Sequence, residues 1–281
     1  MEKLIMFRTE ASCYDGPFGG SSGWIAAGMG FVYITGDGSL IVIDGGNVED
    51  GENFVELLCA LGGDVANVKL WVLTHPHIDH YGALRTVIES ERLRRRVKVE
   101  RIMCLFPEQL ASQDRHEPFI RRACDMLSET LKVTKAAFVE PYDSLTLRIG
   151  TARLRVLSVP RLSAYTGPNS LSLIFSITGE KSRVLFTGDA TKERLSETAR
   201  RCGSLLKSDI LQIPHHGLCD SGDIPFYRLV GAHTLLVPTC RAGERAMKSG
   251  YYKDATEPEL YAERHAKLIC RAYEGTMTLT L

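Results

Sequence analysis

Four side chains that commonly bind metals lie within six residues of the sequence, directly after an apolar run. The stretch LWVLTHPHIDHYGAL, residues 70–84, holds three histidines and one aspartate in this space. A core does not accept such side chains unpaired, and a surface loop has no need to gather them. The preceding VKLWVLTH has the composition of a short buried strand, so the cluster begins on a loop that a strand holds in place. Any fold of this chain must leave that strand end open to a site formed by His75, His77, Asp79 and His80.

The first half of the chain combines a hairpin with helices. Two β-rich runs, residues 30–35 and 39–46, are separated by the turn GDG, which predicts an antiparallel hairpin. Apolar residues then recur at helical spacing in GENFVELLCALGG, which ends at two glycines. After the cluster, residues 82–95 predict a helix with a basic end, and residues 101–106 predict a buried strand. A predicted helix over residues 118–131 is a candidate lid over the site.

The second half repeats this plan. From residue 144 the chain is again rich in strands, and a helix over residues 192–202 leads into the strand-and-loop stretch DILQIPHHG. The repetition predicts an α/β fold in which two halves pack sheet against sheet as a four-layer αββα sandwich, with the ligand loops at one edge. The 281 residues include no Pro/Ser-rich linker and suit one large core, so residues 1–281 are predicted to form a single domain.

Further ligand-type side chains follow strands in the second half. FTGDA leaves Asp189 at the end of a strand, and IPHHG leaves His215 and His216 in the same kind of place. Neutral imidazole and carboxylate are the usual ligands of Zn²⁺ and related cations. In the first cluster, two histidines alternate and can face one centre, whereas the aspartate and the last histidine follow a turn and can face a second. The pattern therefore predicts a site for two divalent metal ions.

Composition limits the partners. Lys+Arg and Asp+Glu both number 34, so bulk attraction to a long nucleic acid or to a membrane surface is not expected, although a local patch is compatible with this balance. The first residues lack the apolar core of a signal peptide, and no segment approaches the ~18 apolar residues of a membrane span, so a cytoplasmic protein is expected. Eight cysteines form no C-x-x-C pair, which favours reduced core thiols.

Several motifs together carry a family resemblance. THPHIDH resembles the H-x-H-x-D-H signature of the metallo-β-lactamase superfamily, and IDGG before it and TGDA and PHHG after it occur in the expected order. More narrowly, NSLSLIF, RVLFTGD and LKSDILQIPHHG resemble the branch with the metal-dependent domain of DNA-uptake competence channel proteins and related hydrolases. GMGFV lacks an acid that this branch usually has, and a downstream Gly-His-Pro element is missing from residues 240–260. Both absences argue against a nuclease role.

The resemblance implies roles for individual residues. His75 and His77 resemble ligands of a first metal, Asp79 and His80 ligands of a second, and Asp189 the carboxylate that bridges both. The metals that the family implies are most often zinc ions.

Two positions after the first motif complete the implied site. His215, the first residue past its strand, resembles the last ligand of the second metal, which leaves His216 to contact a ligand or the substrate. Where many members carry another histidine on the first metal, GPNSLSL offers Asn169, as the competence branch does. An amide oxygen is a weak, hard ligand, so the first site should hold zinc less tightly and accept manganese or iron.

These residues predict metal-dependent hydrolysis by a metal-bound hydroxide. Two cations lower the pKa of a shared water and polarise the electrophile. Asp79 and Asp189 are expected to orient the hydroxide, and His216 to protonate the leaving group. The favoured substrate is a small phosphate ester or a short phosphodiester. Two alternatives stay open: hydrolysis of a carbonyl ester, lactone, thioester or amide, and a metal-bound sensing or interaction protein without turnover.

Two neighbouring features receive a structural interpretation. The basic run of residues 91–101 is interpreted as a solvated helix end and strand start in preference to a phosphate-binding patch. Asp44, in the turn IDGG, is expected to lie beneath the metals as a partner of a ligand histidine.

Overall fold

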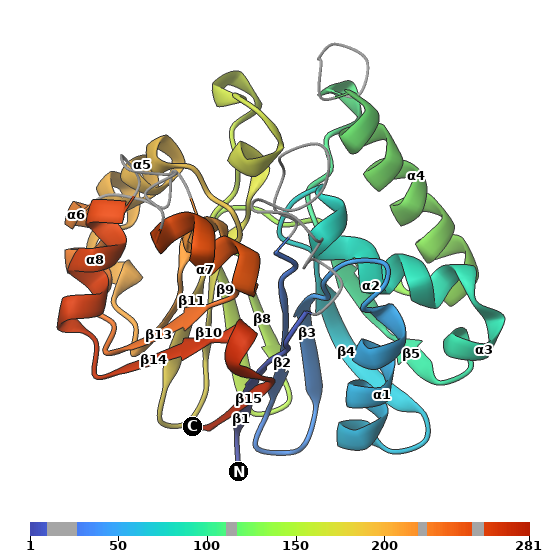
Figure 1. Cartoon of the computed structure of the whole chain (residues 1–281). Coiled ribbons are helices and arrows are strands. Elements are labelled where there is room, and N and C mark those ends of the chain that lie inside the picture. The colour runs from blue at the N-terminus through green and yellow to red at the C-terminus, as the bar shows by residue number, and fades with distance from the viewer. Residues whose placement is uncertain (10–26, 111–116, 219–223, 249–255) are drawn as a thin grey trace.

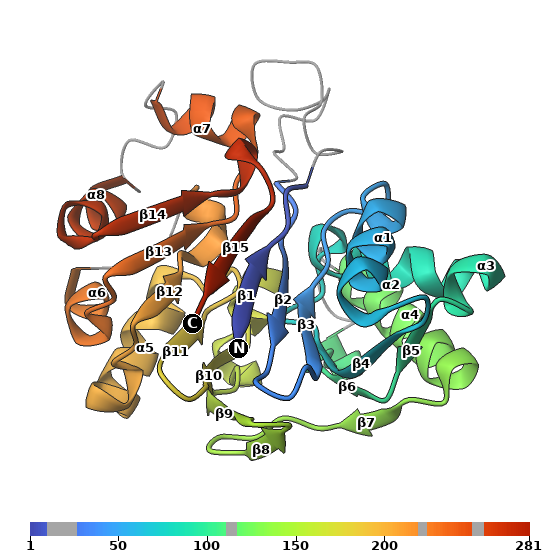
Figure 2. The same cartoon turned by 90° about the horizontal axis from the view of Figure 1, so that it is seen from below.

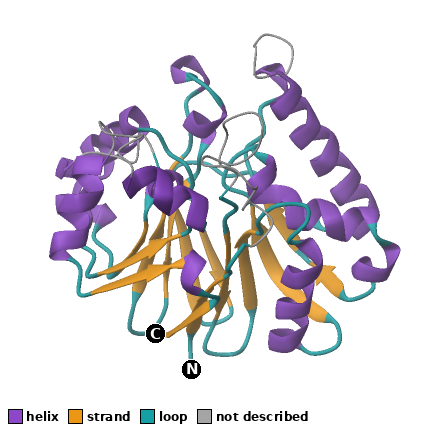
Figure 3. Cartoon of the chain, viewed as in Figure 1, coloured by secondary structure: helices purple, strands orange, loops and turns teal. Residues whose placement is uncertain are grey.

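The computed structural model describes residues 1–9, 27–110, 117–218, 224–248 and 256–281. These residues form two β-sheets that pack face to face, with helices on both outer sides (Figures 1 and 3). The predicted α/β fold, a four-layer αββα sandwich, is confirmed. In each sheet an antiparallel group of strands continues into a parallel group, so the two halves follow the same plan.

The first sheet is built around the predicted hairpin. Its two strands pair antiparallel, with Gly30 opposite Asp44. The sheet contains, in spatial order, β15 (Met277–Thr280), β1 (Lys3–Met6), β2 (Gly30–Ile34), β3 (Leu40–Asp44), β4 (Ala66–Val72), β6 (Arg101–Met103) and β7 (Ala137–Val139), and β5 (Val97–Val99) also pairs with β4.

The second sheet is formed by β8 to β14, whereas the last strand, β15, pairs within the first sheet. Viewed from below, β15 and β1 lie side by side, so both ends of the chain meet on the first sheet (Figure 2). The second sheet contains, in spatial order, β14 (Leu268–Arg271), β13 (Thr234–Val237), β12 (Ile210–Gln212), β11 (Arg183–Phe186), β10 (Ile174–Thr178), β9 (Ala152–Ser158) and β8 (Thr146–Ile149).

Three apolar layers hold the sandwich together. The central layer lies between the sheets, where Phe31 from β2 meets Phe186 from β11 edge to face at 5.5 Å. One outer layer joins the first sheet to α1 (Gly51–Gly62), α2 (Ile78–Glu89), α3 (Glu91–Arg94) and α4 (Glu117–Thr134). The other joins the second sheet to α5 (Lys192–Cys202), α6 (Ile224–Val230) and α8 (Thr256–His265), while α7 (Arg241–Lys248) follows β13.

The shared central layer supports the prediction of one domain over residues 1–281, which stays a prediction. Of the described helices, none has the length and apolar character needed to cross a membrane. The cysteines that the structure describes are free thiols, as expected, and Cys13 and Cys219 lie outside the described residues.

The helix after the ligand cluster begins earlier than the sequence predicts. The expected helix over residues 82–95 is divided into α2, which starts at Ile78, and α3, because Ser90 is extended (φ −110°, ψ 112°). The Ser90 hydroxyl accepts a hydrogen bond from Leu93 N–H and caps α3. The early start places Asp79 and His80 in the first helical turn.

Close packing then holds this turn against the first sheet. A Cβ atom at Gly82 would collide with the backbone of Asn47 and Val48, so only glycine lets α2 approach the loop after β3 this closely. Asp79 O also accepts a hydrogen bond from Met29 N–H at 3.0 Å. The helix that carries two ligand candidates is thereby fixed next to the end of β3.

Candidate metal centre

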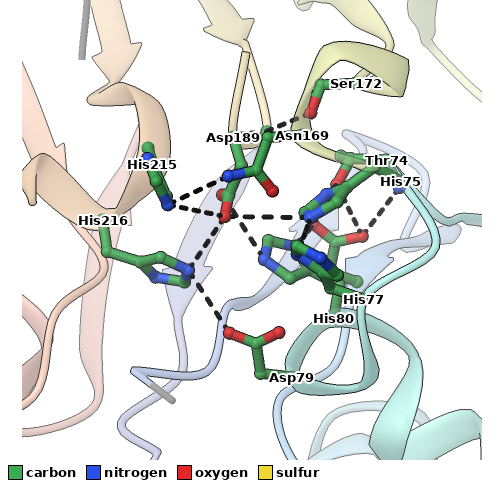
Figure 4. A network of polar contacts seen from close by, with 12 residues as sticks. Thr74, His75, His77, Asp79, His80, Asn169, Ser172, Asp189, His215 and His216 are labelled. Atoms are coloured by element: carbon green, nitrogen blue, oxygen red, sulfur yellow. Dashed lines mark hydrogen bonds and ion pairs between the residues drawn. The ribbon is translucent and has the colours of Figure 1, made fainter. Parts of the chain in front are cut away.

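The predicted ligand residues converge at one edge of the sandwich, where strands of both sheets end (Figure 4). The loop after β4 and the first turn of α2 supply the first cluster. The loop after β11 supplies Asp189, and the 3-10 helix η5 (Pro214–Gly217) after β12 supplies the histidine pair. Two groups of three potential ligand atoms result, each within 4.8 Å: His75, His77 and Asp189 form the first group, and Asp79, His80 and His216 form the second.

In the first group the two histidines point their ring nitrogens at each other. His75 Nε2 lies 3.0 Å from His77 Nδ1 and 3.8 Å from Asp189 Oδ2. Burial lowers the pKa of His75 well below its ordinary value, and the neighbouring His80 lowers it further, although Asp189 opposes the shift. His75 is therefore neutral, which is the state of imidazole that binds a cation.

The second group lies against both oxygen atoms of the same carboxylate. Asp189 Oδ1 lies 3.4 Å from His80 Nε2, while Asp189 Oδ2 lies 3.3 Å from His216 Nε2. His216 Nε2 is also 3.6 Å from Asp79 Oδ2. Asp189 thus belongs by distance to both groups, which is the position that the sequence assigned to a bridging carboxylate.

Asp189 is buried yet charged. Burial alone would raise the pKa of its carboxyl group, but the positive charges of His216 and His80 outweigh burial and hold that pKa well below the ordinary value. Asp189 in turn raises the pKa values of these two histidines against the effect of burial, and bound cations would take the place of their Nε2 protons. The Asp189 backbone N–H donates to Ser172 Oγ at 3.0 Å, which helps to fix the turn after β11. A negative charge therefore stands between the two groups of ligand atoms.

A buried carboxylate orients His80 from behind. His80 Nδ1 donates to Asp44 Oδ2 at 2.9 Å, which turns the Nε2 atom towards the centre, where a cation would replace its proton. Asp44 also accepts hydrogen bonds from Thr74 N–H at 2.8 Å and from the Thr74 hydroxyl at 2.9 Å. Its backbone is left-handed (φ 54°), a conformation that aspartate tolerates better than most residues. Asp44 lies where the sequence placed it.

The histidine pair divides between two directions because its backbone is left-handed. His215 has φ 49° and His216 has φ 57°, so neighbouring side chains of η5 diverge. His216 Nδ1 donates to Pro238 O at 2.7 Å, and its Nε2 faces the second group. His215 Nε2 instead lies 3.1 Å from Asn169 Nδ2 and 3.9 Å from Asp189 Oδ2.

This geometry favours His216 as the metal ligand and His215 as the outer contact, which is the reverse of the predicted roles. The sequence suggested His215 as the ligand and His216 as the outer contact, but His216 is the one grouped with Asp79 and His80. The His216 side chain is 1% exposed, and that of His215 is 18% exposed. Two adjacent histidines have the same side chain, so the sequence does not show which of them faces the centre. The direction of each side chain is set by the turn of the backbone.

Unsatisfied buried atoms test whether cations fit this centre. Among the described residues, His80 Nε2, His216 Nε2 and Asp189 Oδ1 have no hydrogen-bond partner although all three are buried. Leaving such atoms unpaired costs roughly 1–3 kcal/mol each. Lone pairs of two imidazoles and a carboxylate, aimed at one space, are the donor set of Zn²⁺ and related divalent ions. The residues therefore fit divalent cations.

Asn169 lies in the 3-10 helix η3 (Pro168–Leu171) next to Asp189 and His215 (Figure 4). Its amide nitrogen contacts His215, and its Oδ1 atom is buried without a hydrogen-bond partner in the described structure. That oxygen is the atom which a metal would take. Asn169 as a ligand stays a prediction.

Two contributors to the centre were missed by sequence reasoning. The ring of Phe119, in the first turn of α4, packs edge-on against His77 at 5.7 Å and is 41% exposed. This contact brings one end of the predicted lid helix to the first group. The second is the carbonyl of Pro238, which accepts the hydrogen bond from His216 Nδ1. In the sequence, only its position directly after the strand β13 could have pointed to this role.

Comparison with known proteins agrees with the site. The model of the Metallo-beta-lactamase superfamily matches residues 27–222, more than half of the chain, so the protein belongs to this superfamily. It is an enzyme of the metallo-hydrolase class. No curated protein sequence matches the chain.

Solved structures share the fold at low sequence identity. YhfI from Bacillus subtilis, a metallo-beta-lactamase fold protein, is 11% identical, with TM-score 0.55 and 100% of both chains covered. Zn²⁺-bound PqqB from Methylobacterium extorquens is also 11% identical, with TM-score 0.59 and 100% of both chains covered. CmlA from Streptomyces venezuelae, a diiron β-hydroxylase, is 12% identical with TM-score 0.57, over 99% of this chain and 54% of CmlA. Such likeness concerns the fold alone.

Proposed function

We propose that the protein hydrolyses a small phosphate ester or a short phosphodiester. The observation that carries the proposal is the position of Asp189, whose two oxygens face His80 at 3.4 Å and His216 at 3.3 Å while His75 lies 3.8 Å away. When bound, two divalent cations would lower the pKa of a water, polarise a phosphoryl oxygen and stabilise the leaving oxygen of an in-line displacement. The chain's part is to hold both cations close together.

Each group of residues has a defined task in this proposal. His75 and His77 would hold one cation, and Asp79, His80 and His216 would hold the other. Asp189 lies close to both groups, and its charge would balance part of the charge of the cations. The Asp44 carboxylate and the Pro238 carbonyl keep the proton of each second-group histidine on Nδ1, so that Nε2 stays available.

The hydroxyl groups around the ligands support water as the nucleophile. The Thr74 hydroxyl donates to Asp44 Oδ2 at 2.9 Å, and Ser172 Oγ accepts from Asp189 N–H at 3.0 Å. Both hydroxyls therefore have structural tasks. His215, more exposed than His216 and beside Asp189, is proposed to contact the substrate or its leaving group.

Zinc is proposed as the main metal because imidazole nitrogen and carboxylate oxygen dominate the donor set. The Zn²⁺ of PqqB and the diiron centre of CmlA support zinc and iron as candidates on this fold. The preference for phosphorus rests on the close pair of ligand groups and on the resemblance to the competence branch, which stays a prediction. A cytoplasmic location and a small or short substrate are further parts of the proposal.

A substrate panel tests the proposal. Metal-stripped protein is reconstituted with zinc, manganese or iron and assayed on p-nitrophenyl phosphate, bis-p-nitrophenyl phosphate, a lactone and a thioester, with Asp189→Asn as the control. We expect the phosphate substrates to be turned over and Asp189→Asn to lose this activity. Faster turnover of the lactone or thioester would favour the carbonyl alternative. Full metal loading without turnover of any substrate would favour a sensing role.

A further inference from the structure

The outer face of the second sheet is divided into two parts. Towards the metal centre it is apolar and covered by helices, as Leu157 of β9 and Leu185 of β11 pack with Leu195 of α5. Towards the opposite end it carries arginines on three strands, two exposed and two partly exposed. We call this second part the arginine face, formed by Arg148 of β8, Arg153 and Arg155 of β9, and Arg183 of β11.

Strand register places these arginines side by side. Arg148 is directly opposite Arg153, and Arg153 is opposite Thr178 of β10, which in turn is opposite Arg183. Arg155 stands two residues further along β9 on the same face. Residues directly opposite share one side of a sheet, with strands ~4.8 Å apart and same-side neighbours ~7 Å apart along a strand. Like charges in this arrangement destabilise a sheet.

The arginine face has little compensation from carboxylates: among the described residues, Asp209 opposes the lowering of the Arg183 pKa but forms no ion pair with that side chain. Within the described structure none of its four side chains forms an ion pair. Asp209 is close, but its Oδ2 atom accepts from the Arg183 backbone N–H at 2.8 Å. The Arg183 side chain donates to Ser176 Oγ and to Leu205 O, and its Nε is buried without a hydrogen-bond partner. Burial and then Arg155 and Arg153 lower the pKa of Arg183.

The basic run of residues 91–101 shows the opposite behaviour. Arg92 pairs with Glu52 at 2.6 Å, Arg95 pairs with Glu91 at 2.5 Å, and Arg96 pairs with Glu56. Its interpretation as a solvated helix end therefore agrees with the structure. The contrast matters because three arginines of the obvious basic stretch are paired with carboxylates, whereas in the described structure none of the four arginines of the arginine face is in an ion pair.

We propose that the arginine face binds the phosphate backbone of a single nucleic-acid strand. Guanidinium groups bind phosphate oxygens in pairs of hydrogen bonds, and a strand offers one phosphate per nucleotide to successive arginines. The hydroxyl of Thr178, between Arg153 and Arg183, adds a donor of the kind that contacts phosphates. The net charge of zero concerns the whole chain and does not remove this local field.

The chemistry of the face favours nucleic acid over other anionic partners. The outward residues of this part of the sheet that reach the surface are arginines and threonines, namely Thr146, Arg148, Arg153, Arg155, Thr178 and Arg183, while Ser176 is buried beneath Arg183. A protein interface normally has an apolar core, and membrane binding normally adds apolar side chains to basic ones. Binding of backbone phosphates requires neither an apolar core nor apolar side chains. The inference is independent of the reaction at the metal centre, because the two sites lie towards opposite ends of the strands.

Fluorescence anisotropy with a labelled ~20-nucleotide oligodeoxythymidine tests this surface over a range of salt concentrations. The variant combines Arg148→Gln, Arg153→Gln and Arg155→Gln, and leaves Arg183 in place because its side chain also bonds within the fold. The matched control removes the same charge from the paired run and combines Arg92→Gln, Arg95→Gln and Arg96→Gln. Thermal unfolding and metal content establish that both variants are folded, and single substitutions replace any that is not.

We expect the wild type to bind the oligonucleotide and the arginine-face variant to bind it at least about tenfold more weakly, with the salt slope reduced by ~2 for three lost contacts. The control should stay within about twofold of wild type. Absence of binding by the wild type, or equal losses in both variants, would overturn the proposal. So would equally tight, arginine-dependent binding of polyglutamate or of phosphatidylserine-containing vesicles, which would indicate an acidic protein or a membrane.

Discussion

Replacing Asp44 by asparagine tests how much the orientation and protonation of one metal ligand, His80, depend on its buried carboxylate partner. Asparagine has nearly the same shape and tolerates the left-handed backbone at this position (φ 54°). Its carbonyl oxygen can still accept from Thr74 N–H, now 2.8 Å from Asp44 Oδ1. Its NH₂ group, however, takes the place of the oxygen that accepts from His80 Nδ1 at 2.9 Å.

Two donors cannot face each other, so the variant should move the His80 proton from Nδ1 to Nε2. Nε2 is the atom that lies 3.4 Å from Asp189 Oδ1, and a protonated nitrogen there has no lone pair for a cation. Loss of such outer partners typically reduces metal affinity 10–100-fold, which corresponds to about 1.4–2.7 kcal/mol. The metal-free fold should also lose about 1.5–3 kcal/mol with the charged hydrogen bond.

Competition against a chromophoric chelator measures the metal affinity, and chemical denaturation of stripped protein measures the free energy of unfolding. Asp125→Asn on α4, which removes the same charge from an exposed position, serves as the control and should change neither quantity. If Asp44→Asn bound zinc as tightly as the wild type, Asp44 would not set the protonation of His80. The proposed orientation of the second group would then be refuted.

Three further predictions concern the ligands themselves. His80→Ala and Asp189→Ala should each remove most of the bound metal and activity, since no neighbouring group replaces a lost ligand; elemental analysis and turnover check this, and full stoichiometry with wild-type rate would contradict the site. His216→Ala should lose metal from the second group, whereas His215→Ala should keep the metal and lose turnover; the opposite pattern would restore the order suggested by the sequence. Asn169→His should raise zinc affinity and lower any manganese-dependent activity, as metal titrations of stripped protein will measure; unchanged zinc affinity would mean that position 169 does not reach a metal.

Local patterns explain why much of the fold was predictable. The hairpin of β2 and β3, the helix α5 and the strands that follow residue 144 result from periodicity and turn residues that lie close together in sequence. The start of α2 was misplaced because its first turn holds the ligand cluster, whose polar residues conceal the helical period. Packing of Gly82 against the loop after β3 supports that turn instead.

The sequence by itself determined which residues could bind metal and that they follow strand ends, because four metal-binding side chains within six residues have few other uses. Only the tertiary structure decided which of these residues belongs to which group of ligand atoms. The left-handed backbone of η5 turns His216, not His215, to the second group, and residue type does not encode that turn. The arginine face likewise depends on strand register, because Arg183 is distant in sequence from the other three arginines and meets them only where β8, β9, β10 and β11 pair side by side.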